Sequence, residues 1–222
     1  MKYILTFLII CAITSTAISQ TFKGQSEFSA SYGINSFQQS LQGGIGGGSE
    51  VTEITSATPN LFLTYRYYLS NRFAIGITIG TQQFTTASYD PYYTGVSNLP
   101  YKTDAYNYTT VTAEFLYNYL NRHWVRLYTY IGVGCSFYKK NIWEYSGPNN
   151  APWTNTSGNQ AAFNMQYVPI AISVGGRLSG FAELGIGYKG FLNAGISYRL
   201  PYHAPKSILK QKHNDDPVLV KY

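Results

Sequence analysis

The chain has 222 residues, enough for one domain of ordinary size, and only 12% of them are charged while 17% are aromatic. This low charge, together with 22 Tyr and 21 Gly, is typical of a sheet-rich protein and argues against a helical enzyme, which would be richer in Ala, Leu, Glu and Lys. The net charge of +6 comes from scattered basic residues and a Lys- and His-containing tail, so we expect no nucleic-acid partner.

The first 19 residues have the order of parts of a secretory signal. Lys2 precedes an apolar run over residues 3–13, and the segment closes on Ala17-Ile18-Ser19, an A-x-S-like cleavage site. The run is too short to cross about 30 Å of hydrocarbon as a helix. Cleavage after Ser19 would leave Cys135 as the single cysteine, so we expect a signal peptide over residues 1–19 and no disulfide within the mature chain.

Beyond residue 20, eight segments alternate between apolar and small or polar residues, which is the two-residue period of a β-strand. One face of each segment carries Leu, Ile, Val, Phe or Tyr, and the other carries Gly, Ala, Ser or Thr with occasional charges. In chain order the segments are 28–34, 61–69, 73–81, 111–119, 125–137, 168–174, 182–188 and 192–200. The pattern predicts an all-β protein of eight antiparallel strands.

The connections alternate between short and long. Short links lie at 70–71, 121–122 and 176–180, whereas 35–60, 83–108 and 139–162 are long and rich in Gly, Ser, Thr, Asn, Tyr and Pro. Lys189-Gly190 is the exception, because it is as tight as the short links but belongs to the long side. Tight turns on one rim and long loops on the other are typical of membrane barrels, and loops of this length are unusual in a compact soluble domain.

The two faces of the strands also have a predicted direction. The non-apolar face is too poor in charge to be a wetted exterior, so we expect the apolar face to point to lipid, where a charge at mid-membrane would cost about 2–4 kcal/mol. Tyrosines near strand ends on the apolar face would then form interfacial girdles, the alternative being ordinary strand aromatics. They are Tyr65, Tyr67, Tyr117, Tyr119, Tyr188 and Tyr198.

With this strand count, alternation and loop rhythm, residues 25–200 resemble the small eight-stranded outer-membrane barrels, the OmpX-like and OmpA transmembrane-domain-like proteins. The resemblance implies an eight-stranded antiparallel up-and-down transmembrane β-barrel, placed in the lipid of the bacterial outer membrane by the barrel-assembly machinery. It leaves activity open, because members range from structural proteins to adhesins and enzymes. Such chains often end on an aromatic residue of the last strand, whereas here a short tail, predicted to be periplasmic, follows the barrel of residues 20–200 and covers residues 201–222.

Six charges lie on the inward face if the strands are traced from a periplasmic N-terminus. They are Glu27, Arg66, Glu114, Arg126, Glu183 and Arg199. These three acids and three bases would lie in the half of the lumen nearer the periplasm, which we call the inner half. An eight-stranded barrel is only just wide enough for its interior side chains to fill it, so paired charges would plug the centre. The alternative is a narrow pore in which the same residues form a proton or ion path.

No catalytic constellation is visible at the outer rim. Outer-membrane barrel enzymes generally use a His with Ser, Asp or Glu near that rim, but His123 lies at an inner turn and His203 and His213 lie in the tail. No metal-ligand spacing occurs there, and the glycine tract at 43–48 lacks the Lys-Ser/Thr of a phosphate loop. We therefore expect no enzyme, metal or cofactor, and a lipid-modifying enzyme is the second alternative after the pore.

The long loops are rich in residues that make contacts in recognition surfaces. The candidates are Tyr89, Tyr92, Tyr93, Tyr101, Tyr106, Trp143 and Trp153. Aromatics near lipid headgroups are the alternative explanation. The sequence as a whole predicts a structural or adhesive barrel with a filled lumen, whose loops contact an extracellular ligand.

Overall fold

The computed structural model describes residues 21–34, 36, 51–89, 100–122, 124–145 and 152–201, and nine strands occur in this part of the chain. They are β1 (Ser26–Ile34), β2 (Val51–Ala57), β3 (Asn60–Tyr68), β4 (Phe73–Tyr89), β5 (Lys102–Asn121), β6 (Val125–Tyr145), β7 (Pro152–Gly175), β8 (Leu178–Gly187) and β9 (Leu192–Arg199). Over these residues, no helix has the length and apolar character needed to cross a membrane.

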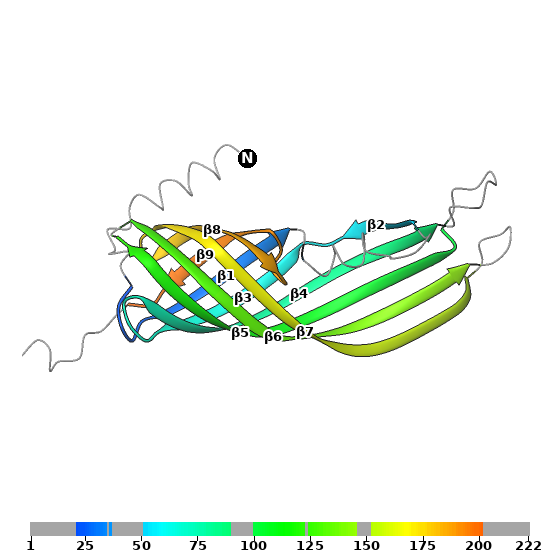
Figure 1. The fold of residues 1–222 in the computed structure, drawn as a ribbon, viewed down its shortest axis with the longest axis horizontal. Helices are drawn as coiled ribbons and strands as arrows, with labels where there is room; N and C mark the ends of the chain where they lie inside the picture. Colours follow the sequence, from blue (N-terminus) through cyan, green and yellow to red (C-terminus); the bar gives the residue numbers. More distant parts are fainter. Residues whose placement is uncertain are drawn as a thin grey trace, which may run out of the picture.

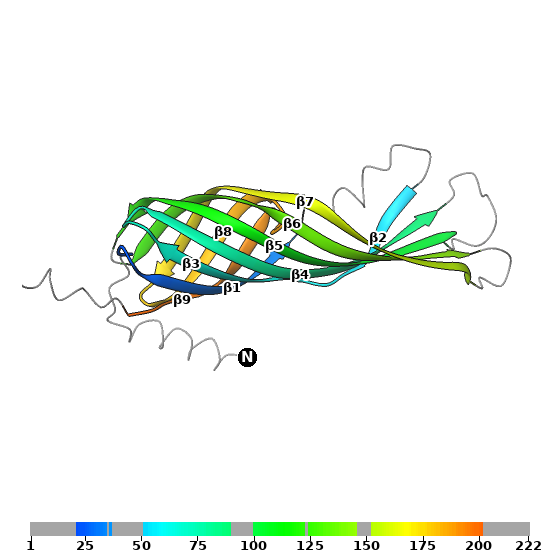
Figure 2. The same ribbon diagram turned by 90° about the horizontal axis from the view of Figure 1, so that it is seen from below.

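Eight of the strands close into a ring (Figures 1 and 2). Each pairs antiparallel with its neighbours in the order β3, β4, β5, β6, β7, β8 and β9, and β1 closes the ring because it pairs with both β3 and β9. β2 is not part of the ring. When it is left out, each strand of the ring lies beside the next strand of the chain, which is an up-and-down arrangement. The predicted fold, an eight-stranded antiparallel barrel, is therefore confirmed.

Four strands continue far beyond the ring on one side (Figure 1). β4 to β7 are 17 to 24 residues long, whereas β1, β3, β8 and β9 have 8 to 10 residues. The pairing of β3 with β4 ends at Thr81, and β2 takes over from Phe84 to Tyr89. The result is an open sheet in the order β2-β4-β5-β6-β7, which we call the outer sheet.

The outer sheet corrects the prediction of three long loops. Much of the predicted links 35–60, 83–108 and 139–162 is β-structure, since β2 lies in the first and the ends of β4 to β7 occupy most of the other two. Thr and Tyr have high β-propensity, but polar residues lie on both faces of these segments. A search for apolar alternation therefore does not detect them.

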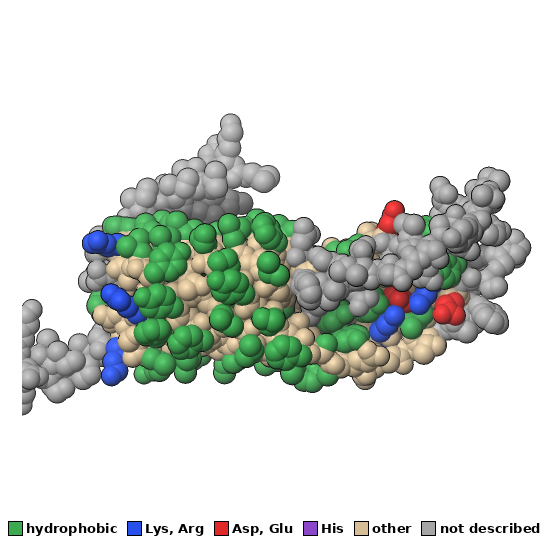
Figure 3. Space-filling model, in the orientation of Figure 1, with side chains coloured by type: hydrophobic (Ala, Val, Ile, Leu, Met, Phe, Trp, Pro, Cys, Tyr) green, Lys and Arg blue, Asp and Glu red, His purple; other side chains and the backbone are tan. Residues whose placement is uncertain are grey.

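Side-chain burial alternates along the ring with the polarity opposite to that of a water-soluble barrel. Leu63, Phe163 and Ile186 are 68%, 72% and 65% exposed, while Glu27, Arg66 and Arg126 are fully buried. Figure 3 shows the resulting band of apolar side chains on one face of the ring. The predicted direction of the two faces, apolar outward and polar inward, is confirmed.

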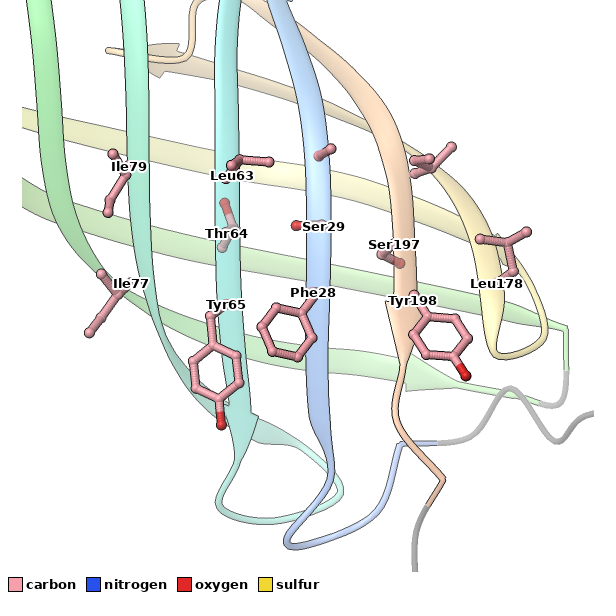
Figure 4. Close-up of a pocket in the computed structure, with 12 residues that line it drawn as sticks. Phe28, Ser29, Leu63, Thr64, Tyr65, Ile77, Ile79, Leu178, Ser197 and Tyr198 are labelled. Carbon is pink, nitrogen blue, oxygen red and sulfur yellow. The ribbon is translucent and has the colours of Figure 1, made fainter.

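Four of the six predicted girdle tyrosines, Tyr65, Tyr67, Tyr119 and Tyr198, are exposed near the ends of their strands, and Tyr117 is half-buried. Figure 4 shows Tyr65, Phe28 and Tyr198 side by side just above the turns, with Ile77 paired with Tyr65 on the next strand and with Leu63 and Ile79 further along the strands. The prediction is wrong for Tyr188, which is buried in the lumen because Gly187 adopts a φ of 143° and ends the alternation of β8.

A second local correction concerns the seventh predicted strand. The two-residue period of segment 168–174 predicts Val168 and Ile170 on the same, outward face, but Val168 is buried, and Pro169 is exposed instead. The register of β7 against β8 shifts between Tyr167 and Ile170, as in a β-bulge. One extra residue in a strand reverses the alternation, and Pro169 is the local sign of it, because a proline lacks the N–H of the ladder and is confined to edges, strand starts and bulges.

Candidate functional site

The inner half of the lumen brings together all six predicted charges, each at most 3% exposed. Strand register places three of them in a row, because Glu27 of β1 pairs with Arg66 of β3 on one side and with Arg199 of β9 on the other. Opposite charges at paired positions of adjacent strands attract one another. The sequence of three neighbouring strands therefore sets this part of the cluster before any contact across the lumen is made.

Glu27 also receives a partner from the opposite wall. Arg126 of β6 donates to both of its carboxylate oxygens, at 2.8 and 3.1 Å, in the two-pronged geometry that makes Arg–carboxylate pairs strong. Arg66 and Arg199 lie 3.5 and 3.6 Å from the same carboxylate. The hydroxyl of Tyr68 donates to it at 3.2 Å and also contacts Arg126. Glu27 thus ties opposite walls of the barrel together.

Arg66 links this inner group to the two other glutamates. Its Nη2 donates to Glu114 at 3.0 Å and to Glu183 at 3.3 Å, and its Nε donates to Glu114 at 3.2 Å. Glu183 is held in addition by Tyr128 and Tyr130, whose hydroxyls donate at 2.8 and 2.9 Å. All three glutamates of the lumen therefore contact one guanidinium.

Lys189 is the lumen residue that the sequence reasoning missed. Its Nζ lies 2.5 Å from Glu114, although the residue sits in the tight turn between β8 and β9. Tyr188 donates to the same carboxylate at 3.1 Å. A lysine in a turn is normally solvated, so the only sequence signal was the glycine on either side, Gly187 and Gly190, both of which have positive φ.

Aromatic rings fill the space between these charges. The guanidinium of Arg126 lies 4.8 Å from the ring centre of Tyr128, and Arg66 and Lys189 lie 5.3 and 5.0 Å from that of Tyr130. Such cation–π contacts stabilise desolvated cations. Tyr128 and Tyr130 could have been predicted as lumen residues, because they share the strand face of Arg126. The arrangement suits a packed plug. With Lys189 included, the lumen cluster has four bases and three acids, which leaves one positive charge in excess.

The outer sheet has an aromatic cluster of its own. This cluster consists of the buried residues Phe84, Tyr106 and Tyr108, together with Tyr138. The ring centres of Tyr106 and Tyr108 lie 5.0 and 5.6 Å from that of Phe84, and the ring centre of Tyr138 lies 4.7 Å from that of Tyr108. Burial raises the pKa of Tyr106 and of Tyr108. Beside the cluster, Asp104 pairs with Lys140 at 2.9 Å.

The predicted recognition residues have different positions in this sheet. The prediction that Tyr106 is a surface contact residue is wrong, because its ring belongs to the buried cluster. Tyr89, Tyr101 and Trp143 are half-buried. Trp153 lies in β7, but its side chain is outside the described residues, as are Tyr92 and Tyr93.

Several other predictions fall outside the described residues. These are the signal peptide, the glycine tract, the tail from residue 202 onward, and His123, His203 and His213. Within the described ranges, no group of three His, Cys, Asp or Glu side chains could hold a metal ion. Cys135 is exposed on the apolar face of β6.

Comparison with known proteins gives similarity in structure only. No family model and no curated protein matches the chain. Similar solved structures include Ail, the attachment invasion locus protein of Yersinia pestis, at 13% identity and a TM-score of 0.42, and its complex with the heparin analogue sucrose octasulfate, at 14% and 0.42. The N-terminal β-barrel domain of Pseudomonas aeruginosa OprF is 11% identical, with a TM-score of 0.41. Each match covers 81% of this chain and 100% of the other. Sequence identities and TM-scores this low do not support a transfer of function to this chain.

Proposed function

We propose that the protein is a structural outer-membrane barrel with a closed lumen, whose outer sheet makes contacts at the cell surface. The observation that carries the proposal is the inverted polarity of the ring, with apolar side chains outside and a charged network inside. A nine-residue strand such as β3 is about 30 Å long at roughly 3.3 Å per residue. At a tilt of about 40° it spans about 23 Å, close to the apolar band of outer-membrane barrels.

The charged network supports a closed barrel in preference to a channel. Each of the three buried glutamates has at least one cation within 3.0 Å or a pair of tyrosine hydroxyls within 2.9 Å. An ion that moved through this space would have to displace paired charges, and each separated charge costs several kcal/mol. We therefore assign the network to stability and assign it no catalytic role.

Replacing Arg126 with Met tests the plug. The variant leaves Glu27 with the Tyr68 hydroxyl and the longer contacts to Arg66 and Arg199, so we expect the free energy of unfolding to fall by about 3 kcal/mol. The measurement is urea unfolding of the barrel in lipid vesicles, paired with single-channel recording in planar bilayers. Lys139→Met is the matched control, because Lys139 is exposed in the outer sheet, away from the lumen. Higher conductance in Arg126→Met without lower stability would contradict the plug.

Cell fractionation tests the location. A closed barrel of this size should be found in outer-membrane fractions and should change its gel mobility on heating, because heat unfolds it. Folded protein that is soluble in the periplasm would overturn the proposal. The apolar exterior makes that outcome incompatible with a monomer, since such a surface needs lipid or a partner to cover it.

A narrow pore is the second candidate, and a few lumen atoms favour it. Asn118 Oδ1, Asn193 Oδ1 and Arg126 Nε are buried and make no hydrogen bond with any described residue. Buried polar atoms are usually hydrogen-bonded, so these three mark where a polar path through the plug would begin. Wild-type conductance steps in a planar bilayer would support the pore.

A further inference from the structure

The exposed charges of the barrel are separated between its two ends. At the inner rim, where the turns are short, the exposed charged residues are Lys23, Arg72, Arg122 and Arg177. No Asp or Glu is exposed there among the residues that the structure describes. Figure 3 shows Lys and Arg side chains at that edge of the apolar band, whereas both signs of charge occur at the opposite end.

Each inner turn carries one of these bases. Arg72 lies in the turn from β3 to β4, Arg122 in the turn from β5 to β6, and Arg177 in the turn from β7 to β8. Lys23 precedes β1, and its backbone N–H donates to the side chain of Asn71. Arg72, Arg122 and Arg177 thus follow one another at intervals of two strands along the rim. Lys23 lies next to the turn that carries Arg72, and that turn is hydrogen-bonded to the next one through Asn71 and Asn121.

Every turn repeats the same short pattern, a base followed by a large exposed apolar residue. Phe73 follows Arg72, Trp124 lies two positions after Arg122, and Leu178 follows Arg177; these side chains are 40 to 45% exposed. An apolar side chain at the edge of the hydrocarbon beside a cation in the headgroup layer is the usual arrangement at a membrane interface. The tyrosines of Figure 4 lie at the same level.

The outer sheet shows that this bias is not general. Its described charges are Glu53, Asp104 and Glu144 with Lys102, Lys139 and Lys140, equal numbers of acids and bases. Asp104 pairs with Lys140 at 2.9 Å and lies 4.0 Å from Lys102. The exposed positive charge in excess therefore lies at the inner rim.

We propose that the inner rim binds anionic glycerophospholipid headgroups, one basic turn to a neighbouring lipid, in the leaflet that faces the periplasm. The inference rests on the proposed membrane location. Each of the three turns places an exposed base at the edge of the exposed apolar band, which is where lipid headgroups meet the hydrocarbon. The apolar side chain beside each base would remain uncovered against a soluble acidic partner, so lipid is the occupant that fits both features. Basic side chains near an anionic membrane surface each contribute attraction that falls off within a Debye length.

Lipid selectivity measures this binding directly. The full mature protein is reconstituted in vesicles of phosphatidylcholine. The vesicles contain a trace of lipid with a nitroxide on its acyl chain, and this labelled lipid is either phosphatidylglycerol or phosphatidylcholine. Electron paramagnetic resonance then gives the fraction of each labelled lipid that the barrel immobilises. We expect the phosphatidylglycerol label to associate about two- to fivefold more strongly, and the preference to vanish in about 1 M salt.

Two charge variants complete the experiment. Replacing Lys23, Arg72, Arg122 and Arg177 together with Gln should abolish the preference, whereas replacing Lys102, Lys139 and Lys140 with Gln should leave it intact. The proposal is overturned if wild type shows no preference, if the inner-rim variant keeps the preference, or if the outer variant loses it. Heat-dependent gel mobility of each sample separates these outcomes from failure to insert, which would instead contradict the proposed function.

Discussion

Gly187 determines which way the side chains at the outer end of β8 point. Its φ of 143° lies where side chains with a Cβ are strained, and a Cβ built there would come 2.1 Å from the carbonyl oxygen of Met165. The residue after it, Tyr188, turns into the lumen and bonds Thr112 and Glu114 at 2.8 and 3.1 Å. One backbone angle therefore supplies two contacts of the plug.

Replacing Gly187 with Ala should lower the free energy of unfolding by about 2 kcal/mol or more, since a left-handed conformation alone costs about 1–2 kcal/mol. Urea unfolding in vesicles measures the loss. Gly180→Ala is the matched control in the same strand, because a Cβ there meets nothing within 4 Å. We expect the control to stay within about 0.5 kcal/mol of wild type. Equal losses in the two variants would show that backbone strain is not the cause.

Residues such as Tyr188 and Lys189 mark the limit of sequence reasoning at this scale. The six charges that lie on regular strands could be placed, because a two-residue period assigns each residue to a face once the strand is known. Tyr188 and Lys189 come after a glycine of positive φ, so the period no longer applies to them. Their burial depends on a backbone conformation that the composition permits but does not specify.

At the scale of elements, the outer parts of β4 to β7 differ from the parts inside the ring. The ring segments have one apolar face and are visible in the sequence for that reason. The outer segments instead have a small buried cluster of Phe84 with tyrosines on one face, and polar residues occur on both faces. Their pairing follows from continuation of strands that the ring has already aligned, which is tertiary information.

The buried tyrosines make the outer sheet sensitive to alkali. Below about pH 10, Tyr108 is protonated in the folded and the unfolded chain and adds no pH dependence. Above that value the unfolded chain releases the proton, whereas burial raises the pKa of Tyr108 and keeps it protonated in the folded chain. Stability therefore falls as the pH rises, by up to about 1.4 kcal/mol per unit for each such tyrosine.

The Tyr108→Phe variant keeps the ring and removes the titrating group. We expect it to match wild type near pH 7 and to lose stability less steeply between about pH 10 and 11.5. Urea midpoints over that range measure the slope. Tyr106→Phe should reduce the slope as well, because burial also raises the pKa of Tyr106. An unchanged slope in both variants would show that these hydroxyls are already exposed to water.

At the scale of the whole molecule, stability and surface contact are assigned to different parts of the chain. The pair formed by Thr81 of β4 and Thr109 of β5 marks the boundary between the two parts. The lumen network and the closed hydrogen-bonded ring lie on the side of this pair that carries the short turns. The aromatic cluster and the outer ion pairs lie on the other side of it. If the ring folds on its own contacts, the outer sheet can be shortened without loss of the barrel.

Replacing residues 84–106 with Asn-Gly tests this independence, because Gln83 and Asn107 are paired and a two-residue turn can join them. We expect the variant to retain heat-dependent gel mobility and its place in the outer membrane, with a smaller dependence of unfolding free energy on urea because less surface is buried. Deleting only residues 90–99 is the control, since it leaves every described strand intact. Failure of the larger deletion alone to fold would mean that the outer sheet supports the barrel, and the division between a stabilising ring and a contacting outer sheet would have to be abandoned.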